Sequence, residues 1–116
     1  MIFEYTIETV KKLKVISLKG DLMEKSQALD LLNEVEDSLA SGFCNFILNL
    51  EDLKYLSSSG LGALISILTR CRKEDGEVVV TNLSKKVKEL FLITKLNSVF
   101  TVTDNMNSAV EFFKEN

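Results

Sequence analysis

Alternating apolar and polar residues open the chain and predict a pair of strands. Between Phe3 and Thr9, polar side chains fill every second position, as in a half-buried strand. Lys11 and Lys12 then form a turn, and an apolar run from Leu13 to Leu18 continues as a second strand. We expect these two strands to pair as a hairpin and the second to end at Gly20.

Helical spacing follows the hairpin. Asp21 and Glu24 have the acid-x-x-Glu spacing of a capping box, and Gly42 stands where a helix C-terminus favours glycine. The apolar stripe between them consists of Ala28, Leu29, Leu32, Val35 and Leu39. The apolar run from Phe46 to Leu50 then predicts a short buried strand.

Three hydroxyls and two glycines lie at the start of the next predicted helix, in the run from Leu56 to Gly62. Between Leu61 and Arg72 the apolar positions have helical spacing; they are Leu61, Leu64, Ile65, Leu68 and Cys71. A helix start offers unpaired N–H groups and a partial positive charge, and serine is a favoured N-cap there. Gly60 and Gly62 keep the turn bare, so the backbone of another molecule could approach closely.

The last third of the chain repeats the strand and helix pattern. Gly76 lies past the end of the central helix, and the β-branched run from Val78 to Val80 predicts a core strand. Ser84 caps a helix that ends at Asn97, with Val87, Leu90, Phe91 and Leu92 inward and with Lys85, Lys86 and Lys88 on its solvated face. A short edge strand from Val99 to Val102 and a final helix follow. This helix is capped by Asp104 or Asn107 and carries Ala109, Val110 and Phe113.

The resulting order, ββαβαβαβα, predicts an α/β fold. Strands that alternate with helices form a mostly parallel sheet with crossover helices, and the hairpin adds an antiparallel part. We expect one domain over residues 1–116, with about five strands and about four helices. Ligands and partners of such sheets meet the loops at the carboxyl ends of the strands, and the serine run is one of these loops.

Composition excludes several classes of function. A net charge of −3 predicts no nucleic-acid footprint, and no apolar run approaches the roughly 20 residues of a membrane span. The first residues carry an early acid and do not resemble a signal peptide, so we expect a cytoplasmic protein. Cys44 and Cys71 are expected to be buried free thiols, and a disulfide needs their two elements to pack face to face.

The sequence also lacks the residues that common catalytic sites need. It contains no histidine, which removes a Ser-His-Asp triad and any histidine-containing metal site. The two cysteines lack CxxC spacing, and neither a P-loop nor a dinucleotide-binding motif is present. We therefore predict no enzyme activity, no metal and no cofactor, because a serine nucleophile without histidine would have only a lysine or a carboxylate as its base.

One part of the sequence resembles the signature of the STAS domain. It consists of the residues from Leu48 to Leu50, Leu53 and the run from Leu56 to Gly62. More narrowly, they are similar to those of the bacterial anti-sigma factor antagonists. The length, the element order and the turn from Gly20 to Leu22 fit as well, so the resemblance covers essentially the whole chain.

This resemblance implies a phosphorylation switch. In the family, the first serine of the loop Asp-Ser-Ser/Thr-Gly-Leu-Gly is phosphorylated by an anti-sigma factor that is also a serine kinase. The matching residue here is Ser58, with Ser59 and Ser57 as alternative acceptors. The unphosphorylated protein would bind the anti-sigma factor and free a sigma factor, and a serine phosphatase would reverse the modification. The implied partner-binding residues are Asp21, Leu22, Met23, Ser57, Ser58, Ser59, Gly60, Leu61 and Gly62.

Two residues depart from the family pattern. Ser57 and Met23 replace acids that the family carries at the surface recognised by the kinase. This difference favours, as an alternative, a STAS module that senses a small ligand or assembles a signalling complex without phosphorylation. The choice of kinase or phosphatase, the sigma pathway and the oligomeric state do not follow from the sequence.

Overall fold

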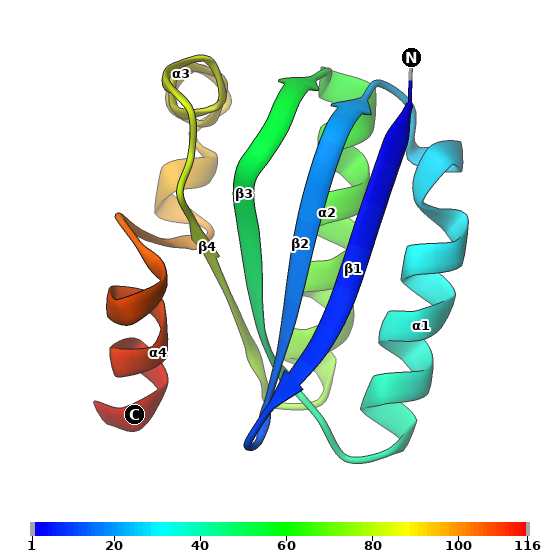
Figure 1. Cartoon of the computed structure of the whole chain (residues 1–116), viewed down its shortest axis with the longest axis vertical. Coiled ribbons are helices and arrows are strands. Elements are labelled where there is room, and N and C mark those ends of the chain that lie inside the picture. The colour runs from blue at the N-terminus through cyan, green and yellow to red at the C-terminus, as the bar shows by residue number, and fades with distance from the viewer. Residues whose placement is uncertain (1, 116) are drawn as a thin grey trace.

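The computed structural model describes residues 2–115, in which a five-stranded sheet carries helices on both faces (Figure 1). The strands lie side by side in chain order, β1-β2-β3-β4-β5. Their bounds are β1 Phe3–Val10, β2 Leu13–Leu22, β3 Asn45–Leu56, β4 Glu77–Thr81 and β5 Thr101–Thr103. β1 pairs with β2 antiparallel, and the other three pairs are parallel. The predicted mixed sheet with its N-terminal hairpin is confirmed.

Four α-helices and two short 3₁₀ turns connect the strands. They are η1 Lys25–Ala28, α1 Leu29–Ala40, α2 Ser58–Lys73, α3 Lys85–Ile93, η2 Leu96–Ser98 and α4 Met106–Glu115. α1 and α2 cover one face of the sheet, while α4 lies on the other (Figure 1). The larger core, around Phe46 and Leu64, fills the space under α1 and α2, and a smaller core around Ile47 and Val79 lies under α4.

The second and third strands are longer than predicted. β2 continues past Gly20 to Leu22, and β3 continues past Leu50 to Leu56. Register shifts allow these ends to stay paired although Glu51 breaks the apolar run. Gly20 is needed within the strand because its φ is +91° and a Cβ there would lie 2.0 Å from the Ile2 carbonyl oxygen.

Three predicted helix boundaries are wrong. The capping box is formed by Glu24 and Gln27 at η1, whereas Asp21 belongs to β2. α3 ends at Ile93, and Asn97 lies in η2. The cap of α4 is neither Asp104 nor Asn107, because Asn105 Oδ1 accepts the Ser108 N–H at 2.9 Å.

Most predicted apolar stripes are buried, with three exceptions. Leu29, Ile65 and Leu92 are 56%, 39% and 61% exposed, so they lie outside the core. Ser84 does cap α3, since its Oγ accepts the Val87 N–H at 3.3 Å. Cys71 is buried, Cys44 is half-buried, and both are free thiols.

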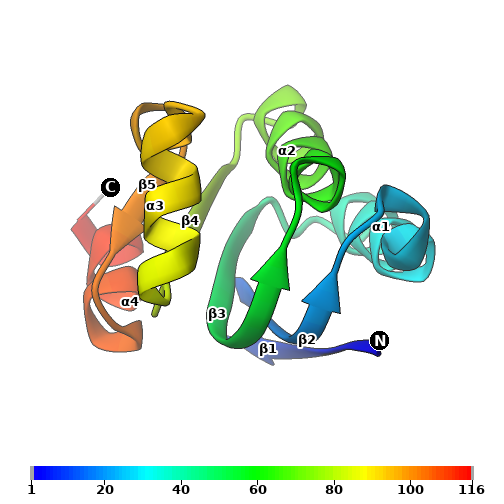
Figure 2. The same cartoon turned by 90° about the horizontal axis from the view of Figure 1, so that it is seen from above.

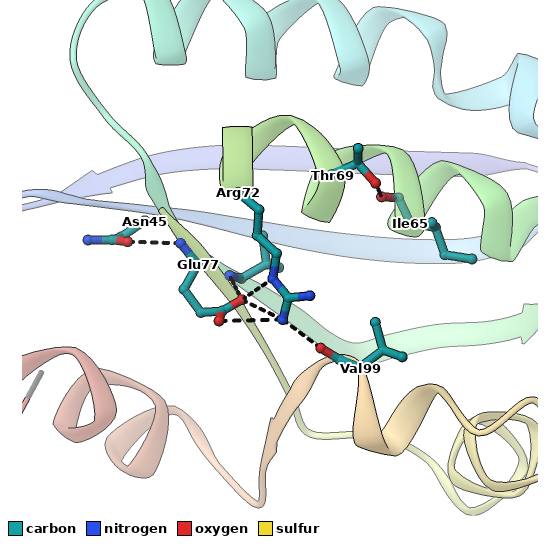
Figure 3. A network of polar contacts seen from close by, with 7 residues as sticks. Asn45, Ile65, Thr69, Arg72, Glu77 and Val99 are labelled. Atoms are coloured by element: carbon teal, nitrogen blue, oxygen red, sulfur yellow. Dashed lines mark hydrogen bonds and ion pairs between the residues drawn. The ribbon is translucent and has the colours of Figure 1, made fainter. Parts of the chain in front are cut away.

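The C-terminal end of α2 is fixed by a polar network that Figure 3 shows. The Arg72 guanidinium lies 3.2 Å from a Glu77 carboxylate oxygen and donates a 2.7 Å hydrogen bond to the Val99 carbonyl. Asn45 Oδ1 accepts the Glu77 N–H at 3.1 Å. These contacts link the C-terminal end of α2 to β4 and to the chain before β5, and they link β4 to β3. They fix the position of α2 at the end opposite its N-terminus.

Candidate functional site

The candidate site is the serine loop, residues 57–62, where β3 ends and α2 begins. Ser57 is the N-cap of α2, with an extended backbone (φ −90°, ψ 169°), and its Oγ accepts the Gly60 N–H at 2.9 Å. The same hydroxyl donates to the Met23 carbonyl, and the Ser57 N–H donates to the Leu22 carbonyl at 3.1 Å. Both hydrogen-bonding roles of the Ser57 hydroxyl are therefore used: it caps α2 as an acceptor, and as a donor it ties the start of α2 to the residue that follows β2.

The next two serines differ from Ser57. Ser58 and Ser59 are the first two residues of α2 and are exposed. Within residues 2–115, neither hydroxyl takes part in a hydrogen bond. Their backbone N–H groups belong to the first turn, where a helix offers no partner of its own and its dipole favours negative charge. A reagent or partner can therefore reach these two hydroxyls without breaking a contact of the fold.

The two glycines of the loop serve different purposes. Gly60 is buried, and a Cβ there would lie 2.1 Å from the Leu22 carbonyl oxygen, so glycine is needed for α2 to pack against β2. A Cβ at Gly62 would meet nothing within 4 Å. We predicted that both glycines keep the turn open to another molecule, but only Gly62 faces open space.

The chain that follows β2 completes the site. The Gln27 side chain accepts the Met23 N–H at 2.7 Å and the Glu24 N–H at 2.9 Å, and it donates to the Asp21 carbonyl at 3.1 Å. These three hydrogen bonds fix residues 21–24 beside Ser57. Asp21 and Met23 are half-buried there.

The fold brings the nine predicted partner-binding residues together, but not all reach the surface. Leu22 and Leu61 are 0% and 3% exposed, and Gly60 is buried with them. These three residues lie beneath the loop and support it, so their side chains are not exposed for contact in this structure. The accessible part consists of Asp21, Met23, Ser57, Ser58, Ser59 and Gly62.

The sequence prediction missed the side of the site formed by β3 and α3. Tyr55 is 51% exposed just before the serine loop, and the Lys86 ammonium lies 5.1 Å from the centroid of its ring. Together with Lys54, they line a hollow of about 80 Å³ between β3 and α3. The lysine run of α3 was visible in the sequence, but nothing there placed it beside Tyr55.

Within residues 2–115, no basic side chain is hydrogen-bonded to a serine hydroxyl of the loop and could activate it as a nucleophile. The Ser57 hydroxyl donates to a carbonyl, and the Ser58 and Ser59 hydroxyls have no hydrogen-bond partner within residues 2–115. In the same residues, no three side chains of the metal-binding types cluster. Nor is any helix among them long and apolar enough to span a membrane. What the site provides is exposed hydroxyls on a rigid helix start.

Comparisons with known proteins match the chain to one family and one fold. The family model described as the STAS domain matches residues 4–109. A protein of Bordetella bronchiseptica named as an anti-sigma factor antagonist, BtrV, is 28% identical over 109 residues, which cover 94% of this chain and 93% of BtrV. The anti-sigma-B factor antagonist of Staphylococcus aureus is 26% identical over 99 residues, covering 84% and 92% of the two chains. The phosphorylated form of the Bacillus cell fate determinant SpoIIAA is similar in fold, with a TM-score of 0.74 at 18% identity and coverage of 95% and 99%.

Proposed function

The chain belongs to the STAS domain family, and from this membership and the geometry of the serine loop we propose that it is an anti-sigma factor antagonist switched by phosphorylation of Ser58. In the unmodified state, it binds an anti-sigma factor that is also a serine kinase, and a sigma factor is released. Phosphorylation of Ser58 ends this binding, and a serine phosphatase restores it. With these partners, the proposed site of action is the cytoplasm, where sigma factors act.

The observation that carries the proposal is the different use of adjacent serines. The Ser57 hydroxyl is engaged twice within the fold, whereas the Ser58 hydroxyl is exposed and has no hydrogen bond within residues 2–115. Phosphorylation of Ser57 would break the cap of α2, which costs about 0.5–2 kcal/mol. Ser59 is also exposed and remains the alternative acceptor.

Phosphorylation of Ser58 is compatible with an intact fold. A phosphate adds roughly −1.5 to −2 charge. At the N-terminus of α2, the helix dipole favours this charge by about 0.3–1 kcal/mol. The unmodified and phosphorylated proteins therefore have similar structures, and the switch acts at the surface.

The same phosphate strongly opposes binding of a partner. An ion that loses water in an interface without compensation costs several kcal/mol. Each 1.4 kcal/mol corresponds to about a tenfold change in affinity. The interface cost exceeds the favourable dipole contribution, so added charge at Ser58 releases the partner without a change of fold.

Phosphotransfer is the direct test. The purified protein is incubated with ATP and candidate anti-sigma kinases from the same genome, and the product is analysed by intact mass and site mapping. We expect the mass of one phosphate on Ser58, its loss in Ser58→Ala, and its retention in Ser57→Ala and Ser59→Ala. A copurified small ligand with no phosphotransfer from any kinase would instead favour the alternative of a ligand-sensing STAS module.

Binding of the kinase tests the second half of the proposal. Ser58→Asp should weaken binding by at least about tenfold relative to the unmodified protein and to Ser58→Ala, because a charge must then be desolvated in the interface. Binding as tight as that of the unmodified protein would refute the switch.

A further inference from the structure

We infer that the docking surface continues from Ser58 across Tyr55 onto the first turn of α3, where it binds an acidic segment of the partner. This lysine patch comprises Lys54, Tyr55, Lys85, Lys86 and Lys88. The inference rests on the proposed function, because it states the charge of the partner segment that binds beside the serine loop. Figure 2 shows this edge from above, with α3 on one side of β3 and the start of α2 following the end of that strand.

The patch lies next to the serine loop. Tyr55 precedes Ser58 by three residues, and an extended chain advances at most roughly 3.3–3.6 Å per residue, so their Cα atoms are no more than about 11 Å apart. Lys54 and Lys86 line the same hollow as Tyr55. Lys85 and Lys88 flank Lys86 in the first turns of α3, and all four lysines are exposed.

Positive charge in this patch is not balanced within the fold. The ion pairs formed by residues 2–115 involve Arg70, Arg72 and Lys114, and none of the four lysines of the patch. The first turn of α3 carries no acidic residue, although the positive end of a helix favours acids and disfavours lysines. The net charge of the chain is −3, so this positive surface is a local feature.

Acidic residues lie on the other side of Tyr55. Asp21, Glu51 and Asp52 line a larger open hollow of about 660 Å³ together with Lys19 and Lys54. The surface around Tyr55 thus changes from mixed, partly acidic charge toward β1 and β2 to three lysines at the start of α3, where the acid of that helix, Glu89, follows in its second turn. This difference gives an acidic segment one favourable orientation, over the patch.

Tyr55 provides the contact area that lysines alone lack. Tyrosine is enriched among the residues that dominate binding energy, and the cation–π contact within the chain holds the Lys86 ammonium beside the Tyr55 ring. Complementary charge chiefly raises the association rate and makes binding sensitive to salt. A partner with glutamates or aspartates facing α3 would therefore associate quickly and would bind less tightly at high salt.

Charge reversal with a matched control tests the inference. Lys54→Glu/Lys86→Glu alters the patch, whereas Lys11→Glu/Lys12→Glu makes the same change in net charge at the exposed hairpin turn between β1 and β2, at the opposite end of the sheet. Binding of the kinase identified by phosphotransfer is measured at low and high salt, with thermal melting to verify folding. We expect the patch variant to lose at least about tenfold in affinity, mostly in association rate, and the control to change by less than about threefold. Tyr55→Ala should also weaken binding, and Tyr55→Phe should retain it.

Equal effects in the two double variants would overturn the inference, because net charge rather than the patch would then govern association. If Ser58→Asp weakens binding but the patch variant does not, the inference alone fails. If Ser58→Asp has no effect, the proposed switch itself fails.

A glutamate-rich peptide tests the patch without the kinase. In NMR titrations, it should shift the amide signals of Tyr55 and Lys86 but not those of Lys11 and Lys12. Shifts that are spread evenly over all exposed lysines would contradict a specific patch.

Discussion

At the residue scale, three identical side chains in a row have two different environments. Ser57 is half-buried and bonded to the Met23 carbonyl and the Gly60 N–H, whereas Ser58 and Ser59 are exposed at the start of α2. The run of serines predicts a cap and an accessible hydroxyl, but it does not determine which serine has which role. That assignment depends on Met23, which lies 34 residues earlier in the chain.

The two loop glycines provide a matched pair of substitutions. Gly60→Ala should lower the free energy of unfolding by about 1–3 kcal/mol, as overpacking does, because its Cβ would meet the Leu22 carbonyl oxygen at 2.1 Å. Gly62→Ala meets open space and should raise it by about 0.5–1 kcal/mol through helix propensity. Urea unfolding measures both changes. A neutral Gly60→Ala would show that β2 and α2 are not packed as described.

At the element scale, the spacing of apolar residues predicts that a helix exists better than it predicts which side chains are buried. In α3, Phe91 is 1% exposed and its ring contacts Phe100 with centroids 5.7 Å apart, whereas the adjacent Leu92 is 61% exposed. The sequence predicts both as inward, because a helix of nine residues leaves the centre of its apolar face uncertain by one position.

Alanine substitution at these two neighbours checks the orientation of α3. Phe91→Ala should destabilise the protein by about 3–5 kcal/mol, since it leaves a cavity in the larger core. Leu92→Ala should change stability by less than about 0.5 kcal/mol, as expected for an exposed side chain. Chemical denaturation of both variants gives the comparison, and equal losses would mean that α3 is rotated relative to the core.

The topology and the placement of the serine loop between a strand and a helix could be predicted from the sequence, because both depend on local patterns. The hairpin, the buried strands and the serine loop each follow from alternation, apolar runs and caps within a few residues. The second half of β3 was missed because Glu51 and Asp52 carry no apolar signal, and their strand conformation comes from pairing with β2. The contact between Tyr55 and Lys86 was missed for a similar reason, since β3 and α3 come together only in the folded protein.

At the scale of the whole molecule, the two free thiols differ in how far the fold must open before a reagent can reach them. Cys71 is fully buried in α2, and burial, the largest cause, together with nearby Cys44, Glu77 and Glu36, raises its pKa from 9.0 to about 12. Cys44 is half-buried in the connection between α1 and β3. The thiolate is the reactive form of cysteine. Cys71 is therefore protected in two ways, because burial keeps reagents away from it and the raised pKa keeps the thiol protonated.

Thiol labelling followed by peptide mapping tests this difference. At pH 8, Cys44 should react in the native protein, and Cys71 should react only at the rate at which the fold opens. The raised pKa means that the folded state favours the neutral thiol. The contribution of the neutral Cys71 thiol to stability is therefore complete below about pH 9, and it decreases as the pH rises toward 12. Rapid native labelling of Cys71 would contradict the packing of α2 against the sheet.

The ends of the described chain lie at opposite ends of the sheet. The Ile2 carbonyl accepts the Asp21 N–H at 2.9 Å, so the chain enters β1 beside the serine loop. The C-terminal part of α4, around Phe113 and Lys114, lies near the β1–β2 turn (Figure 1). An affinity label or fluorophore fused ahead of Ile2 would therefore crowd the surface that we propose as the docking site of a kinase. Fused after α4, the same label would leave that approach clear, and immobilisation through this end would present Ser58 to the solution.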